Sequence, residues 1–265
     1  MITSFLTVSL LVGSCESKKQ SATPKLKKTP VPAEFEPYWG TQEAEVTSFE
    51  LLQARFGSLH KGEALMIFET EQFSRTRQVK MYQDNGKKGD VIQVLRMNQS
   101  RLFNTGVSSS SAMTEVHTPV NRRDGLYALK VSCSVEEWLG QSYSQLNLEA
   151  NKYNVELRSY LETERDQNRV ALMTIPEDQL WCSIRINPKD LPTGEMMLIP
   201  GLLSCRFQNK EITAMKANLT LTNAVPAEMN DQANMMKYVV NYVDDGRLLE
   251  IFFNAASPYE IYGWK

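Results

Sequence analysis

The strongest constraint on the fold is an alternation of apolar and polar residues with a period of two. Successive side chains of a β-strand point to opposite faces, so this period is typical of half-buried antiparallel strands. In the clearest run the apolar side chains are Tyr127, Leu129, Val131, Cys133 and Val135. The same alternation is found in Met215, Ala217, Leu219 and Leu221, in Val155, Leu157 and Leu161, and in Leu203, Cys205 and Phe207. Each of these runs predicts a strand.

Many short strands follow one another along the chain. Further strand candidates are 44–56, 63–70, 78–82, 91–104, 112–120, 143–148, 238–243 and 248–254. Asp245-Gly246 predicts a type I′ hairpin turn between the last two, and Asn85-Gly86 is a weaker turn signal. The consecutive serines within 106–112 predict a loop. We expect a mainly β fold: a large curved antiparallel sheet or incomplete β-barrel with one or two short helices.

Residues 176–188 fit two structures. As a strand they would bury every second residue from Leu180 to Ile186. As a helix they begin with Pro176 and two acidic residues and end before Pro188. These start and stop signals favour the helix, which we expect on the concave side of the sheet.

The N-terminus resembles a bacterial lipoprotein signal. Residues 5–12 are mostly apolar, Gly13-Ser14 are small, and Cys15 follows as the predicted lipidated residue. No Lys or Arg precedes Cys15, and an ordinary secretory signal is the alternative. We predict a signal peptide over 1–14, a lipid-anchored flexible tether rich in Lys and Pro over 15–36, and a single β-rich domain over 37–265.

The residues that could act in catalysis or metal binding do not indicate a particular reaction. It has two histidines, His60 and His117, which argues against a zinc site with several His ligands. It has no nucleotide-binding glycine motif, no H-E-x-x-H and no G-x-S-x-G. A net charge of −2 without a basic stripe argues against nucleic-acid binding. We therefore expect a non-enzymatic protein without a cofactor. A minor alternative is a glycan or lipid hydrolase, in which a histidine would meet a serine or a carboxylate in a cleft.

Cysteines and aromatic residues supply the remaining candidates. Three cysteines follow Cys15, so one disulfide at most can form, and buried free thiols are the favoured interpretation. Aromatic residues with polar neighbours predict a groove for an acyl chain or a sugar, although ordinary sheet packing explains such rings too. The groove candidates are Trp138, Tyr143, Trp181, Tyr262 and Trp264.

Several strings together resemble a known group of proteins. They are Ala44–Leu51, Gln53–Gly57, His60–Ala64, Phe103–Gly106, Glu137-Trp138, Gln145–Asn147 and Ile184–Pro188. This pattern, from about Trp39 to Trp264, resembles envelope lipoproteins of Bacteroidota labelled "septum formation inhibitor Maf". The pyrophosphatase activity of true Maf proteins is not implied, because this chain lacks their Ser/Pro/Arg phosphate motif. More loosely, the expected fold is similar to the LolA/LolB lipoprotein carriers.

These features predict an envelope lipoprotein that binds an apolar ligand, such as an acyl chain, on a concave sheet. The alternative is a scaffold or adaptor that binds another envelope protein through a sheet edge or an aromatic patch. The resemblance implies an outer-membrane location. In that group acidic residues after the lipidated cysteine direct surface export, whereas here Glu16 is followed by Ser17-Lys18-Lys19, so we expect the protein to face the periplasm.

Overall fold

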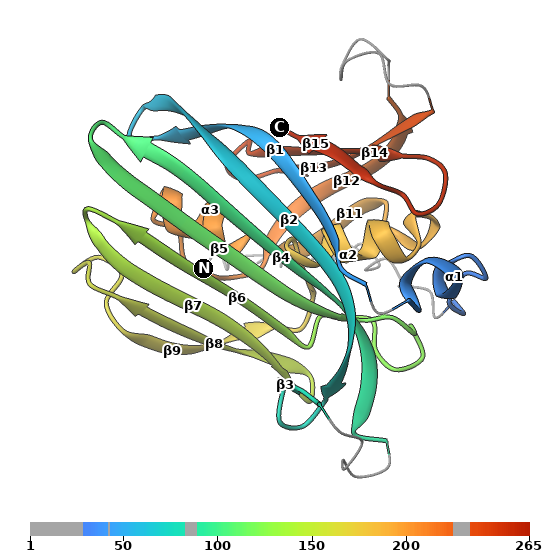
Figure 1. The fold of residues 1–265 in the computed structure, drawn as a ribbon. Coiled ribbons are helices and arrows are strands. Elements are labelled where there is room, and N and C mark those ends of the chain that lie inside the picture. The colour runs from blue at the N-terminus through green and yellow to red at the C-terminus, as the bar shows by residue number, and fades with distance from the viewer. Residues whose placement is uncertain (1–28, 42, 83–88, 225–233) are drawn as a thin grey trace, which may run out of the picture.

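Two β-sheets enclose the core, and the larger one curls into a half-barrel (Figure 1). The computed structural model describes residues 29–41, 43–82, 89–224 and 234–265. The first sheet is antiparallel and has the order β1-β2-β4-β5-β6-β7-β8-β9, with β3 paired to β2. Its strands are β1 (Glu45–Arg55), β2 (Ser58–Ser74), β3 (Val79–Lys80), β4 (Val91–Thr105), β5 (Ser108–Pro119), β6 (Lys130–Glu137), β7 (Gly140–Glu149), β8 (Lys152–Ser159) and β9 (Gln167–Leu172). The expected large curved antiparallel sheet is confirmed.

The second sheet is smaller and also follows chain order, from β10 to β15. Its strands are β10 (Ile175–Pro176), β11 (Gly194–Ile199), β12 (Met215–Asn223), β13 (Met235–Tyr242), β14 (Leu248–Asn254) and β15 (Ile261–Trp264). All its pairs are antiparallel except β10 with β11. The helices are α1 (Phe35–Trp39), α2 (Gln179–Ile186), the 3-10 turn η1 (Pro188–Asp190) and α3 (Leu202–Gln208). None of the helices in the described ranges is long and apolar enough to cross a membrane.

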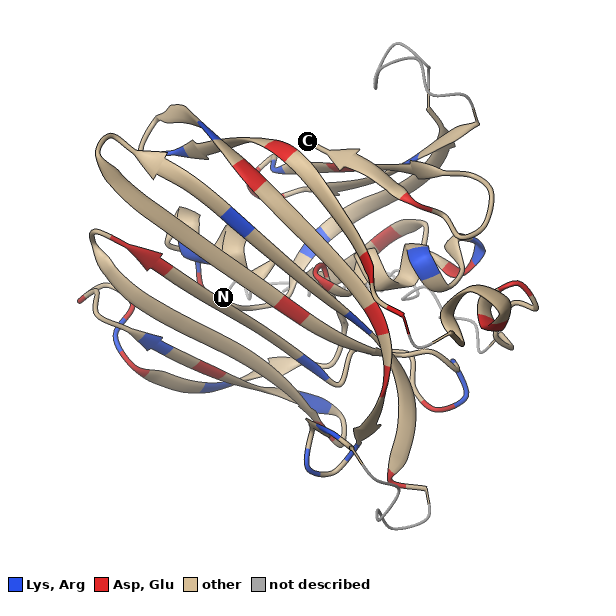
Figure 2. Cartoon of the chain, in the orientation of Figure 1, with Lys and Arg blue, Asp and Glu red and all other residues tan. Residues whose placement is uncertain are grey.

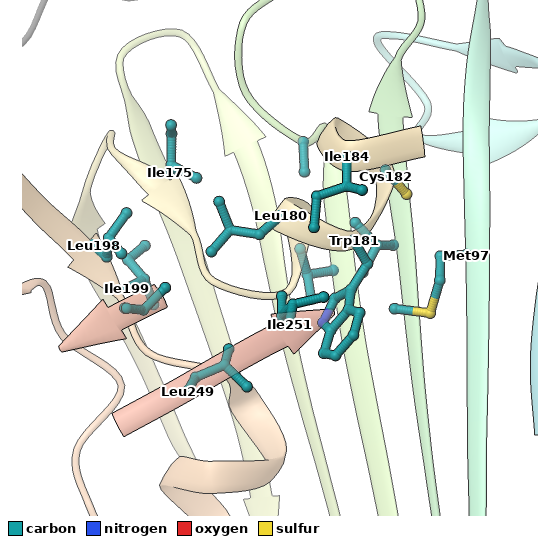
Figure 3. Close-up of a cluster of buried hydrophobic side chains, with 14 of the residues drawn as sticks. Met97, Ile175, Leu180, Trp181, Cys182, Ile184, Leu198, Ile199, Leu249 and Ile251 are labelled. Carbon is teal, nitrogen blue, oxygen red and sulfur yellow. The ribbon is translucent and has the colours of Figure 1, made fainter. Parts of the chain in front are cut away.

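Helix α2 fills the space between the sheets. Every residue of α2 is buried, and its apolar side chains pack between β4 of the first sheet and β11 and β14 of the second (Figure 3). The Cys182 thiol lies 3.5 Å from the carbonyl oxygen of Leu95 on β4. The helix predicted within 176–188, on the concave side, is therefore confirmed.

The described chain begins beside this core. Phe35 and Trp39 of α1 are buried, and the Trp39 ring lies 6.2 Å from that of Phe68 on β2. Phe35 falls within the range predicted as tether, so the packed part of the chain includes the last residues of that range. The signal peptide and Cys15 lie outside the described residues.

Two sequence predictions are wrong. The run Leu203, Cys205, Phe207 is the helix α3, in which Leu202, Leu203, Cys205 and Arg206 are buried at helical spacing. The serine-rich stretch is not a loop, because β5 begins at Ser108 and the turn is at Gly106, with φ 67°.

The hairpin between β13 and β14 is present, but its connection is longer than a type I′ turn. Gly246 has φ 66°, whereas Asp245 does not have the positive φ that a type I′ turn requires. Asn85-Gly86 lies outside the described residues.

Candidate functional site

A cavity of about 900 Å³ lies where the free edges of the two sheets approach each other. The edge strands are β1 and β15, which lie close together in Figure 1. The rings of Phe49 on β1 and Trp264 on β15 are 5.0 Å apart. The exposed Phe56 and Leu59 of the β1–β2 hairpin are among the lining residues, so the cavity opens at that end of the sheet.

Apolar and aromatic side chains form one part of the walls, and polar or charged side chains form about as much of the lining. Trp181 of α2 meets Trp264 edge to face, with ring centroids 5.5 Å apart. The Phe207 ring of α3 packs in the same way against Phe103 of β4, at 6.1 Å. Further apolar residues in the lining are Leu51, Met97, Leu203 and Leu249. Such walls suit a ligand with an extended hydrocarbon part.

A polar group lies on the β4 side of the cavity. Arg101 donates from Nε and Nη2 to the Gln99 side-chain oxygen, at 3.1 and 2.8 Å, and from Nη1 to that of Gln53, at 3.0 Å. Its guanidinium lies 5.3 Å from the ring centre of Trp264. Burial lowers the pKa of Arg101 to about 10. Arg101 lies deep between the two sheets. Its side chain is still half-buried rather than fully buried, because it faces the cavity.

Two acidic residues face the cavity from the segment before α2. Glu177 pairs with Arg247 (Oε1 to Nη2, 2.7 Å) and accepts a hydrogen bond from the Tyr242 hydroxyl at 2.7 Å. Asp178 accepts the Leu202 backbone N–H at 2.9 Å, at the start of α3. Burial, together with the neighbouring Glu177 charge, raises the pKa of Asp178 to about 7.

A buried ionic network holds α3 at the rim of the cavity. Arg55 of β1 binds the Glu137 carboxylate of β6 through Nε and Nη2, at 2.7 and 2.6 Å, and donates from Nη1 to the Phe207 carbonyl at 3.0 Å. Arg206 of α3 lies 3.5 Å from the same carboxylate.

Charges of both signs are interspersed over the rest of the described chain (Figure 2).

The structure brings together two of the five aromatic groove candidates. Trp181 and Trp264 line the cavity. Trp138 is 65% exposed at the β6–β7 turn, with its ring 6.4 Å from that of Phe56. Tyr143 lies on the outer face of β7 and donates to Gln145, and Tyr262 of β15 is not in the lining.

Sequence reasoning did not single out Arg101 and Gln99. A signal for them exists, because they continue the inward-facing series of β4 after Leu95 and Met97 and before Phe103. Two polar residues within a stripe of apolar, inward-facing residues are the sequence pattern that indicates them.

The histidines and cysteines lie away from the cavity lining. His60 Nε2 is 3.1 Å from the Arg55 carbonyl, and His117 Nε2 is 3.4 Å from the Glu71 carboxylate. The three cysteines of the folded region are free and buried, and burial raises the pKa of Cys133 to about 12. The described ranges hold no cluster of His, Cys, Asp and Glu suited to a metal ion.

Of the comparisons with known proteins, the one with solved structures finds a match. No family model matches the chain, and no curated protein matches it. A solved structure described as a β-barrel-like protein of Domain of Unknown Function DUF1849, from Brucella abortus, is similar to this chain with a TM-score of 0.45 and 10% sequence identity. The match covers 84% of this chain and 96% of that one. The resemblance to the lipoproteins labelled Maf and to the LolA/LolB carriers stays a prediction.

Proposed function

We propose that this protein is a non-enzymatic carrier whose cavity holds an apolar ligand such as an acyl chain. The observation that supports this most is the cavity itself: the concave face is packed by α2 and the second sheet, yet about 900 Å³ stays open beside the β1 edge. That volume falls within the range of small-molecule sites, and the aromatic walls match their usual lining. Neither histidine lines the cavity, which gives the hydrolase alternative no support.

The proposal places the carrier in the bacterial envelope, anchored to the outer membrane through a lipid on Cys15 and facing the periplasm. The signal-like sequence before Cys15 supports the anchor. Two acyl chains hold a protein at a membrane stably, and the Lys- and Pro-rich sequence after Cys15 supports a tether between that anchor and the folded domain. Metabolic labelling with a fatty-acid analogue should label the wild-type protein but not Cys15→Ser.

Native mass spectrometry on the full chain carrying Cys15→Ser tests the carrier function. The protein is incubated with a total lipid extract, and we expect one bound lipid per chain. Ser204 on α3 lines the cavity, so Ser204→Trp should fill it and prevent binding, whereas Ser109→Trp, at an exposed position near the start of β5, should not. A wild-type protein that stays free of lipid refutes the carrier function.

A second candidate function is a scaffold that binds another envelope protein through the β1 edge. Within the described ranges β1 ends the first sheet, so its outer edge has no strand partner there. Val46, Leu52 and Phe56 of this hairpin are exposed. Cross-linking in intact cells should then capture one partner at the β1 edge, and a lysine at Leu52 should abolish the capture. Failure of Leu52→Lys to change the cross-linked products would exclude this edge as the interface.

A further inference from the structure

The charge balance of the cavity is unusual at Arg101. Buried cations are normally paired with a carboxylate, because an isolated charge is expensive to remove from water. In the described ranges Arg101 forms no direct ion pair: its hydrogen-bond partners are the neutral oxygens of Gln99 and Gln53, and the carboxylates of Asp178 and Glu177 act on it only from beyond ion-pair distance. A guanidinium placed in this way has capacity left for an anion.

Around Arg101, hydrogen-bond donors outnumber the available acceptors. A guanidinium has five N–H groups, and three are used by the two glutamine oxygens, which leaves one on each terminal nitrogen. The Gln99 side-chain nitrogen is buried and has no hydrogen-bond partner. Arg101 and Gln99 both line the cavity. Unsatisfied donors on two adjacent residues mark a place for a group that only accepts, such as a carboxylate or a phosphate.

The two acidic residues beside α2 do not cancel this preference, and the third acidic residue of the lining, Glu50, is exposed on β1. The Glu177 charge is already bound by Arg247 and by the Tyr242 hydroxyl. Asp178, with its pKa near 7, is mostly protonated in mildly acidic solution and then carries no charge that would repel an anion.

We infer that the cavity binds acyl chains that end in an anionic group, with the head on Arg101 and Gln99 and the chain between Trp181, Trp264 and Phe207. This inference rests on the proposed carrier function and specifies its ligand. An amphipathic ligand matches this arrangement, because fixed donors lie on the β4 side and aromatic side chains line the same cavity. A carboxylate and a phosphate monoester are both acceptors that such a fork can bind.

Three ligands with the same chain test the inference: dodecanoate, dodecyl phosphate and dodecanol. Calorimetric titrations at pH 6 use the full chain carrying Cys15→Ser. We expect the anions to bind about tenfold or more tightly than the alcohol, because hydrogen bonds to a charged group are the stronger ones. A preference for dodecanoate alone assigns a fatty acid, and one for dodecyl phosphate alone assigns a lipid that ends in a phosphate monoester; either supports the inference.

Arg101→Met supplies the second half of the test. It should reduce the affinity for the anions to that for dodecanol and leave dodecanol binding unchanged within about twofold. Arg123→Met, at an exposed arginine outside the lining, is the matched control and should keep the preference. Equal binding of all three ligands by the wild type overturns the inference while the carrier function stands. If none of the three binds, the carrier function falls with it.

Discussion

Asp178 should make the stability of this protein depend on pH in the direction opposite to that of a carboxylate held in an ion pair. Its pKa is raised from 3.8 to about 7, chiefly by burial. An acid whose folded pKa is raised binds its proton more tightly in the folded state, so the unfolded state loses protons first as pH rises. The contribution of the protonated acid is fully present below the unfolded pKa, declines between pH 4 and 7, and is absent above.

The magnitude follows from the shift. Roughly three units at about 1.36 kcal/mol each give about 4 kcal/mol lost between pH 4 and 7. Asp178→Asn removes this loss and keeps an oxygen that can accept the Leu202 N–H. We expect the variant to match the wild type near pH 4 and to exceed its unfolding free energy by about 4 kcal/mol at pH 8.

Urea unfolding of both proteins at pH 4, 5, 6, 7 and 8 measures the difference, with the m-value checked for constancy. Asp244→Asn changes an exposed aspartate in the β13–β14 connection and is the control, which should parallel the wild type. If Asp178→Asn also parallels the wild type from pH 4 to 8, the carboxyl is not buried as described, and the reasoning is refuted.

Three more predictions concern the network, the aromatic walls and the thiols. Glu137→Ala leaves Arg55 buried without its carboxylate, while Arg206 keeps Glu164, and should lower the unfolding free energy by about 3–5 kcal/mol. Glu156→Ala, in an exposed pair, should change it by less than about 1 kcal/mol; urea melts that show equal effects would contradict the buried network. Bound ligand should change the tryptophan emission spectrum, and this response should persist in Trp138→Phe and be reduced in Trp264→Phe; the reverse pattern would place the ligand elsewhere. In the protein carrying Cys15→Ser, the three buried cysteines should not react with a thiol reagent at pH 8 until denaturant is added, and prompt reaction in the folded state would show them to be accessible.

Most strands could be predicted from the sequence, because the alternation of apolar and polar residues is enough to locate them. A one-residue shift would turn every side chain of a half-buried strand to the wrong face, so the alternation is strongly marked. The exception, Leu203 to Phe207, is too short to separate a period of two from one of 3.6. Its helical structure depends on Asp178 accepting the Leu202 N–H and on Arg206 reaching Glu137, contacts between residues far apart in the chain.

The cavity could be predicted only in part. Its aromatic walls were within reach because Trp181 and Trp264 stand out in the sequence. Trp138 stands out equally, yet it is exposed at a turn. Which ring faces inward depends on how β15 approaches β1, and no local pattern encodes the meeting of two sheet edges.

The strand order also has a consequence for how the chain folds. In each sheet neighbouring strands are neighbours in sequence, apart from the β2–β4 pair that bypasses β3, and the hairpins β1–β2, β4–β5, β6–β7 and β7–β8 each close a short loop with little loss of entropy. Contacts of α2 and α3 with β4, β5 and β6 join residues much farther apart. It follows that each sheet can form from local contacts, and that the slow step of folding is the closure of one sheet over the other. The cavity between their free edges is then the last part of the native structure to form.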